Sequence, residues 1–228
     1  VRAGARAAVG RSLVDDLAAC NWHPSTGIFG TAALLPALSE TGHDAEALRT
    51  LLQRDSPSWG HMLEHGATTM WERWRADELD ASMNSHSHPA LGSVGSWLMG
   101  YLAGIRPMKP GFARFRIDPR IPPAGEVSWV EASYRSVVGE IAVAWARRGH
   151  GTALHATVPA GTRAVVTLPT GDAEAVTEQG RALTDVPGVG PARQVDGRLE
   201  VEVGSGSYAF TVEGRPQASA SQSGGTAR

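Results

Sequence analysis

The sequence changes its pattern near residues 107–110, and this change constrains the fold more than any other feature. Before it, apolar residues recur at helical spacing, and six of the eight histidines and five of the seven tryptophans occur there. After it, short alternating segments lie between glycine and proline turns. We therefore predict an α+β protein with a helical part over residues 1–107 and an antiparallel β-sandwich over residues 108–213. Residues 214–228, rich in Ser, Gly, Ala and Gln, are predicted to form a disordered tail.

Four segments of the first part have the apolar spacing of helices. Thr31 and Asp44 are predicted to cap the second and third, and Gly42 and Gly104 to end the second and fourth. Pro36 lies inside the second segment and predicts a kink or a late start. Four helices with long loops are too few to close a core. We therefore expect the C-terminal part of a helical barrel or bundle whose other helices lie upstream.

The second part carries seven segments with the alternation of β-strands. Turn residues separate them, as in Pro159–Gly161 and Pro169–Gly171. Seven short strands at this spacing favour a β-sandwich. The predicted strands cover residues 112–117, 126–130, 137–145, 152–158, 163–168, 199–203 and 208–212.

Composition limits the classes of partner. The formal net charge of −2 gives no electrostatic reason to expect nucleic acid or an anionic membrane as a partner. No apolar run approaches the length of a membrane span, so we expect a soluble protein, either cytoplasmic or secreted. Cys20 is the single cysteine, so an intrachain disulfide is excluded. The chain opens on Val1 without a signal-peptide pattern, which we interpret as a cut from a longer protein.

The stretch Ser58–Trp74 has the composition of a carbohydrate site. It holds three tryptophans, two histidines and two glutamates, and it lies in the longer of two unpatterned loops, residues 21–30 and 55–89. Loops of this length are usually functional. Tryptophan faces bind the apolar face of a sugar, and a carboxylate between two of them is what a glycosidase uses to activate water.

Glu72 is the carboxylate that this pattern selects as a general base. Trp71 and Trp74 flank it, and we predict that both contact the sugar. The alternative is that Glu72 forms a surface pair with Arg73 or a salt bridge within the loop. Glu64 is the competing carboxylate. We expect it to support the site without touching the sugar, together with His65, Arg73 and Asn84.

His86 and His88 lie two residues apart, just before a predicted helix start. A metal pair is one interpretation, with His61, His65 or Asp80 as further ligands. The sequence contains no HExxH or Cys-His ligand pattern, so we favour a histidine that hydrogen-bonds a sugar hydroxyl, and predict no metal site. His88 is the better candidate because it is nearer the helix that would position it.

Taken in order, these segments resemble the bacterial α-L-rhamnosidases, the inverting glycoside hydrolase family 78. The resemblance is dense over residues 20–120 and looser beyond them. The segments that carry it are Thr26–Thr31, Leu34–Gly42, Leu51–Gln53, Pro57–Trp74, Ser82–Asn84 and His88–Leu98.

The resemblance implies the C-terminal part of an (α/α)6 barrel followed by an antiparallel β-sandwich. It implies that Glu72, in Ala-Thr-Thr-Met-Trp-Glu-Arg-Trp, is the general base, that His88 contacts rhamnose and that Trp71 lines the sugar pocket. The implied substrate is a terminal α-L-rhamnoside, hydrolysed with inversion and without a cofactor.

The chain departs from the family pattern in ways that affect activity. The family's general acid lies upstream of the Thr26–Thr31 segment and outside this chain, so activity is expected to need the N-terminal part of the same catalytic domain. The loop 75–82 is shorter than usual, and Ser87 and Pro89 replace the residues that commonly flank the histidine. Two alternatives stay open, a non-catalytic carbohydrate-binding fragment and an (α/α)6 glycosidase for another sugar.

Overall fold

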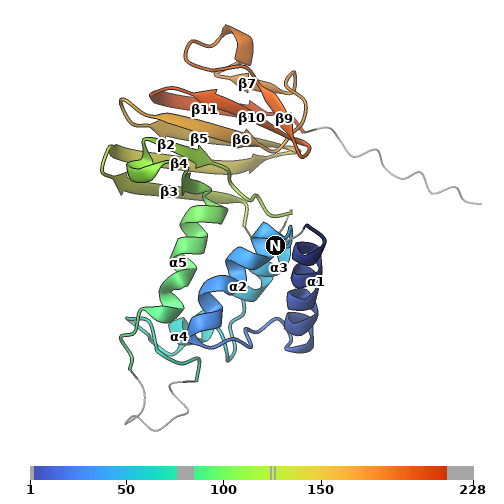
Figure 1. Cartoon of the computed structure of the whole chain (residues 1–228), viewed down its shortest axis with the longest axis vertical. Coiled ribbons are helices and arrows are strands. Elements are labelled where there is room, and N and C mark those ends of the chain that lie inside the picture. Colours follow the sequence, from blue (N-terminus) through green and yellow to red (C-terminus); the bar gives the residue numbers. More distant parts are fainter. Residues whose placement is uncertain (1–2, 76–84, 124, 126, 215–228) are drawn as a thin grey trace, which may run out of the picture.

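The computed structural model describes residues 3–75, 85–123, 125 and 127–214. The helices lie together on one side and a two-sheet sandwich on the other (Figure 1). The predicted tail over 214–228 lies outside the described residues apart from Gly214, and Asn84 lies outside them as well. Within the described residues, no helix has both the length and the apolar character needed to cross a membrane.

The helical part buries a leucine-rich core that also contains Trp97. Leu17, Leu35 and Leu38 have no more than 1% of their surface exposed, and Trp97 joins them at 1%. The run over residues 90–102 is helical throughout, because a 3₁₀ turn precedes α5 and a π turn follows it. The helices are α1 (Ala3–Ala19), α2 (Ile28–Glu40), α3 (Asp44–Leu51), α4 (Trp59–Glu64) and α5 (Val94–Trp97).

The four predicted helices are present, but two predicted caps are wrong. Thr31 lies inside α2, which begins at Ile28, and its hydroxyl donates back to the Gly27 carbonyl at 2.8 Å. The Thr31 hydroxyl therefore hydrogen-bonds a carbonyl of the preceding helical turn and does not cap the start of the helix. Asp44 is the first residue of α3, and His43 occupies the cap position.

Sequence spacing did not reveal α4, which has only six residues. Ser58 caps it, since its side chain accepts a hydrogen bond from the His61 amide at 2.9 Å. This short helix lies in the stretch that was predicted as a long loop. It places Trp59 and Met62 in the core beneath the candidate site.

The sandwich consists of a five-stranded and a six-stranded sheet. Neighbouring strands are antiparallel except for β2 and β6, which pair in parallel. The first sheet has the order β1 (Ile105–Pro107), β2 (Arg114–Ile117), β6 (Arg163–Leu168), β10 (Arg198–Val203) and β9 (Arg193–Val195). The second has the order β3 (Trp129–Ser136), β4 (Gly139–Arg148), β5 (Gly151–Val158), β11 (Gly206–Val212), β7 (Val176–Glu178) and β8 (Arg181–Ala182).

The predicted sandwich is confirmed, and each of the seven predicted segments contains or overlaps a strand. The strands that sequence reasoning missed, β1, β7, β8 and β9, have two or three residues each, too few to show an alternation. Because β1 pairs with β2, the first sheet begins at Ile105, slightly before the predicted boundary at 107.

Backbone and side-chain contacts join the two parts closely. The Trp145 indole of β4 donates to the Leu102 carbonyl at 2.9 Å, and the Asp118 amide donates to the Gly104 carbonyl at 2.9 Å. Gly104 has φ +84°, and a Cβ there would collide with the backbone of Asp118 and Pro119. Only glycine suits this position, since it combines a left-handed backbone with close approach.

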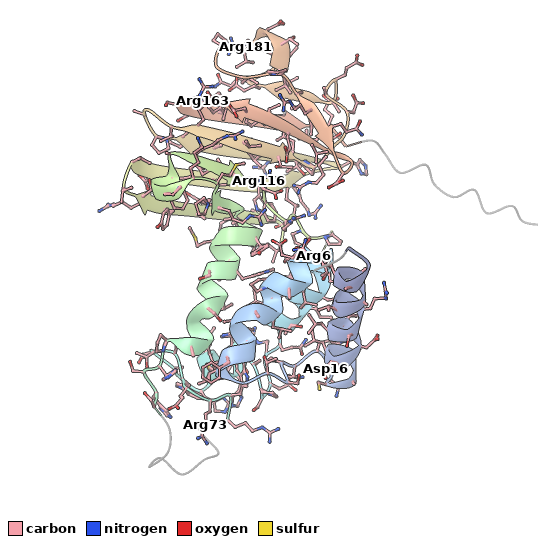
Figure 2. The ribbon with its side chains drawn as sticks, viewed as in Figure 1. Arg6, Asp16, Arg73, Arg116, Arg163 and Arg181 are labelled. Carbon is pink, nitrogen blue, oxygen red and sulfur yellow. The ribbon has the colours of Figure 1, made fainter. Side chains whose placement is uncertain are left out.

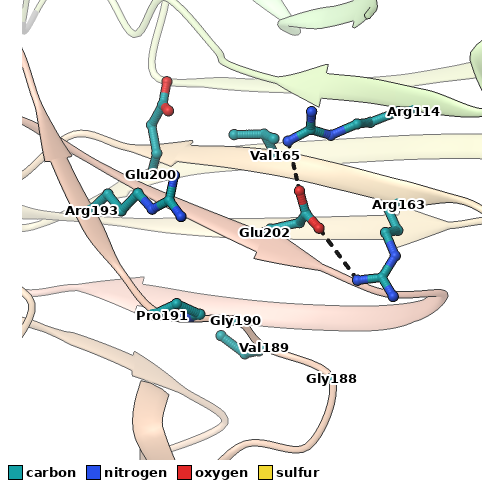
Figure 3. Close-up of a pocket in the computed structure, with 10 residues that line it drawn as sticks. All are labelled: Arg114, Arg163, Val165, Gly188, Val189, Gly190, Pro191, Arg193, Glu200 and Glu202. Carbon is teal, nitrogen blue, oxygen red and sulfur yellow. Dashed lines mark hydrogen bonds and ion pairs between the residues drawn. The ribbon is translucent and has the colours of Figure 1, made fainter. Parts of the chain in front are cut away.

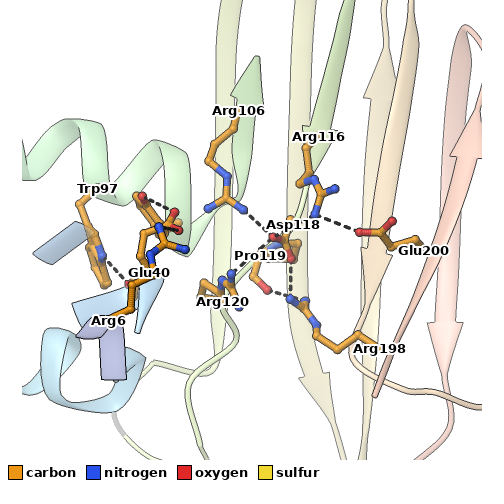
Figure 4. A network of polar contacts seen from close by, with 12 residues as sticks. Arg6, Glu40, Trp97, Arg106, Arg116, Asp118, Pro119, Arg120, Arg198 and Glu200 are labelled. Carbon is orange, nitrogen blue, oxygen red and sulfur yellow. Dashed lines mark hydrogen bonds and ion pairs between the residues drawn. The ribbon is translucent and has the colours of Figure 1, made fainter. Parts of the chain in front are cut away.

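Asp118 lies at the centre of an arginine cluster at this junction (Figure 4). Its carboxylate is 3% exposed, and Arg106 and Arg198 each contact one of its oxygens at 2.5 Å. Arg120 and Arg116 lie at 3.7 and 4.0 Å. One buried carboxylate therefore holds guanidinium groups from β1, β2, β10 and the segment after β2.

Asp44 lies beside this cluster, and burial raises the pKa of its carboxyl group above the ordinary 3.8. Burial outweighs the opposing effects, which are a hydrogen bond with Ser39 and the charges of Arg120 and Arg198. One carboxyl oxygen, Oδ1, is buried without a hydrogen-bond partner among the described residues. The folded state therefore favours the protonated form of Asp44.

A raised folded-state pKa gives a pH-dependent stability with a definite sign. The stabilisation from protonated Asp44 is fully present below pH 3.8, the ordinary pKa of the group. It is lost as the pH rises through the raised pKa of the folded state. We therefore expect the Tm of the wild type to fall relative to that of Asp44→Asn over this interval. Calorimetry of both proteins at several pH values measures the difference. A Tm difference that does not change with pH, or that changes in the opposite direction, would contradict the prediction.

Candidate active site

Two segments form the candidate site at the end of the helical part that lies away from the sandwich (Figure 1). They are residues 69–75 and 85–89, and they run side by side in opposite directions. The Glu72 amide donates to the Ser85 carbonyl at 2.9 Å, and the His88 amide donates to the Met70 carbonyl at 2.8 Å. The backbone therefore brings Glu72 and His88, which were predicted separately, into one small region.

The Glu72 side chain is held by the opposite segment. Its Oε2 accepts a hydrogen bond from the Ser85 amide at 3.0 Å, and the residue is half-buried. A backbone donor orients one carboxylate oxygen and leaves the other for a water molecule or a ligand. A general base needs a positioned oxygen within hydrogen-bond reach of the proton that it takes, and this arrangement is compatible with that need.

Arg73 does not pair with Glu72 in the part of the chain that the structure describes. It is exposed and lies at the lower end of the molecule (Figure 2). The structure thus gives no support to the alternative in which Glu72 and Arg73 form a surface pair.

Trp71 lies beneath the surface rather than on it. It is 4% exposed and packs with Met62 and Leu91. His86 stacks on the Trp71 ring with centroids 5.1 Å apart and planes 25° apart, and His61 meets it edge-on at 6.3 Å. His86 is exposed, so the ring that faces solvent here is the His86 imidazole. The sequence had predicted that Trp71 would be the exposed ring.

Trp74 joins the two long loops. Its indole Nε1 donates to the Thr26 carbonyl at 2.8 Å, and its ring meets Trp59 edge-to-face at 4.9 Å. Trp59 in turn donates to the Leu91 carbonyl at 2.9 Å. Thr26 belongs to the unpatterned loop 21–30, so this chain of contacts fixes that loop against the Glu72 segment.

His88 is half-buried just before the helical run that begins at Ala90. Its Nδ1 accepts a hydrogen bond from the Ala90 amide at 3.3 Å, which means that Nε2 carries the proton when the ring is neutral. The ring is therefore oriented by the start of the helix, and Nε2–H is the group that could donate to a ligand.

Glu64 and His65 lie near the site but make contacts of their own. Glu64 accepts a hydrogen bond from the Arg54 guanidinium at 2.6 Å, in an ion pair on the surface. His65 Nδ1 contacts the His61 carbonyl at 2.9 Å, and the two imidazole rings lie 4.0 Å apart. Among the described residues, no group of three His, Cys, Asp or Glu side chains could hold a metal ion.

Sequence reasoning missed two contributors to the site. Ser85 acts through its backbone amide, which has no signal in a side-chain pattern. His86 was weighed as a metal ligand and was placed behind His88 as a sugar-binding histidine. Its stacking on Trp71 depends on which residues oppose each other across the two segments. The signal that could have indicated His86 is its position fifteen residues after a tryptophan in an aromatic-rich loop, which is weak.

Comparison with known proteins identifies the family. Residues 1–102 match the bacterial alpha-L-rhamnosidase 6 hairpin glycosidase domain, and residues 104–183 match the bacterial alpha-L-rhamnosidase C-terminal domain. The chain belongs to the bacterial α-L-rhamnosidases. The resemblance drawn from the sequence motifs is thereby confirmed.

Curated and structurally solved rhamnosidases agree with this assignment. An alpha-L-rhamnosidase of Streptomyces avermitilis is 40% identical over 91% of this chain. A crystal structure of the rhamnosidase from that species with L-rhamnose covers 93% of the chain with a TM-score of 0.84 at 39% identity. The alpha-L-rhamnosidase of Dictyoglumus thermophilum covers 87% with a TM-score of 0.76 at 31% identity.

The chain is short beside its relatives. It spans 20% of the length of the Streptomyces protein and 22% of a Formosa agariphila alpha-L-rhamnosidase that is 29% identical to it. About four fifths of each of these relatives therefore lies outside the region that this chain matches.

Proposed function

We propose that this chain supplies the general-base side of an inverting α-L-rhamnosidase. Glu72 accepts a proton from a water molecule, which attacks the anomeric carbon of a terminal α-L-rhamnose as the bond to the leaving oxygen breaks. The observation that carries the proposal is the Glu72 carboxylate, held through Oε2 by the Ser85 amide in the region that also contains His88. We assign to His88 a hydrogen bond from Nε2–H to a sugar hydroxyl.

The leaving oxygen needs a proton from a second carboxyl group. In inverting glycosidases the two carboxyl groups lie about 6.5–9.5 Å apart, leaving room for the water. Glu64 is a poor candidate for this acid because its carboxylate is bound by Arg54. We therefore propose that the acid comes from the part of the catalytic domain that this chain does not span.

Burial of Trp71 supports catalysis over simple sugar binding. A non-catalytic binding fragment would need open tryptophan faces as a platform. Trp71 is 4% exposed beneath His86, and the indole of Trp74 is bound to Thr26. Both rings are better placed to position loops than to bind a sugar face to face.

Hydrolysis of aryl glycosides by the natural protein that carries this chain tests the proposal. We expect 4-nitrophenyl α-L-rhamnoside to be hydrolysed faster than the corresponding glucoside, galactoside and xyloside. Proton NMR of the first product formed should show β-L-rhamnose, because inversion converts the α anomer to the β anomer. Faster hydrolysis of another sugar would contradict the substrate, and first release of α-L-rhamnose would contradict the inverting mechanism.

A further inference from the structure

The outer face of the five-stranded sheet carries charged side chains on neighbouring strands. Arg114 of β2 lies beside Arg163 of β6, and Glu200 of β10 lies beside Arg193 of β9. The residues that alternate with them, such as Phe115 and Val201, are fully buried in the sandwich core. Because successive side chains of a strand point to opposite faces, the charged residues share the face turned away from the core.

A cavity of about 480 Å³ lies on this face (Figure 3). The loop Gly188–Pro191 forms one side, and it is held to β10 by the Gly190 amide, which donates to the Glu202 carbonyl at 2.7 Å. The charged side chains come from four paired strands. Ten residues line the cavity, and the charged ones are Arg114, Arg163, Arg193, Glu200 and Glu202.

Positive charge exceeds negative charge in and around the cavity. Glu202 is shared by Arg114 at 2.6 Å and Arg163 at 3.3 Å. Glu200 is paired with Arg116 at 2.9 Å, just outside the lining. These pairs use both glutamates and leave the guanidinium of Arg193 without an ion pair among the described residues.

A buried donor is also left unused. Arg114 Nε is buried and has no hydrogen-bond partner in the described part of the chain. Buried polar groups normally find a partner, and a guanidinium group offers donors only. The cavity therefore carries the exposed guanidinium of Arg193 on β9, which is open to a carboxylate from solvent, beside an arginine on β2 whose Nε has no partner among the described residues.

We propose that this cavity binds the carboxylate of an acidic sugar, a uronic acid or a uronate residue of an oligosaccharide. Guanidinium groups match the planar carboxylate with paired hydrogen bonds. The two glutamates accept hydrogen bonds from hydroxyl groups and oppose a doubly charged anion such as phosphate. None of the ten lining residues is aromatic, so a neutral sugar would lack a stacking surface. The volume lies within the usual range of about 300–1,000 Å³ for small-ligand sites.

The choice of a sugar to carry the carboxylate rests on the proposed function. A glycoside hydrolase with an accessory acidic-sugar site would bind rhamnosides that contain uronate more tightly than neutral ones. The cavity lies on the sandwich. The segment 69–75, which contains Glu72, lies at the far end of the helical part (Figure 1). Binding and hydrolysis can therefore be measured separately.

Calorimetric titration of the natural protein with sodium D-glucuronate tests the proposal. D-Glucose and inorganic phosphate serve as the neutral and the dianionic comparison. We expect glucuronate to bind at least tenfold more tightly than either, and Arg193→Gln to weaken glucuronate binding by about 10- to 100-fold, as for loss of a charge-assisted hydrogen bond. Arg135→Gln is the matched control, because Arg135 is an exposed arginine on β3 of the other sheet.

The possible outcomes separate this site from the proposed activity. Equal binding of glucose or phosphate, no glucuronate binding up to about 20 mM, or an unchanged affinity of Arg193→Gln would overturn the site. Hydrolysis of the aryl rhamnoside is assayed in the same samples and should be unchanged in Arg193→Gln. Glucuronate binding without rhamnoside hydrolysis would support the site and refute the proposed function. Rhamnoside hydrolysis without glucuronate binding would support the proposed function and refute the site.

Discussion

Replacing Glu72 by Gln is expected to lower kcat for 4-nitrophenyl α-L-rhamnoside by about 10²- to 10⁴-fold, the usual loss when a general base is removed. Glutamine has the same shape and retains an oxygen that can accept the Ser85 amide hydrogen bond. It cannot take a proton from water. The substitution therefore removes the chemistry while preserving the contact between the two segments of the site.

Glu64→Gln is the matched control for this experiment. Glu64 lies in the same aromatic-rich stretch, but it is exposed and pairs with Arg54 on the surface. A surface ion pair contributes little stability, so we expect kcat to stay within about twofold and Tm to change little. Steady-state kinetics of both variants, together with their Tm values, test the assignment. If Glu72→Gln keeps near-normal turnover, or if Glu64→Gln loses as much, Glu72 is not the base.

Asp118→Ala is expected to destabilise the protein by about 3–5 kcal/mol, the cost of removing one partner of a buried ion pair. Asp118 is 2% exposed, and its two oxygens contact Arg106 and Arg198 at 2.5 Å. The substitution leaves these guanidinium groups close together without their carboxylate. Since the cluster lies where the helical part meets the sandwich, the loss affects the packing of the two parts.

Calorimetric unfolding measures this effect. For a domain of about 150–250 residues, each kcal/mol changes Tm by roughly 2–4 °C, so we expect Tm to fall by about 6–20 °C. Asp185→Ala is the control, because Asp185 is an exposed carboxylate in the short 3₁₀ turn after β8. A Tm decrease of Asp118→Ala no larger than that of Asp185→Ala would show that the cluster contributes nothing to stability.

Local patterns predicted the secondary structure well where elements are long. The predicted segments 152–158 and 163–168 match the bounds of β5 and β6 closely. In β5 buried residues alternate with less buried ones, as they must in a strand with one face in the core. Elements of two or three residues, such as β8 and β9, contain less than one repeat of any pattern. Their positions are set by pairing with strands elsewhere in the chain.

The candidate site was predictable in its residue types but not in their exposure. A loop with tryptophans, histidines and a carboxylate at 72 indicates sugar chemistry, and the order of motifs indicates the rhamnosidase family. Packing decides which aromatic ring is exposed to solvent. Trp71 is buried because Met62 and Leu91 lie against it and His86 stacks on its face. None of these contacts follows from sequence spacing.

The sequence by itself determined the family, the order of helices and strands, and Glu72 as the candidate base, because these depend on local periodicity and on motifs of neighbouring residues. Only the tertiary structure decided how the carboxylate is held, how the loops meet and where the arginines gather. These contacts join residues 13, 48 and 80 positions apart, as in Ser85 with Glu72, Trp74 with Thr26, and Arg198 with Asp118. Such hydrogen bonds are set by the packing of whole elements, and local spacing does not encode them.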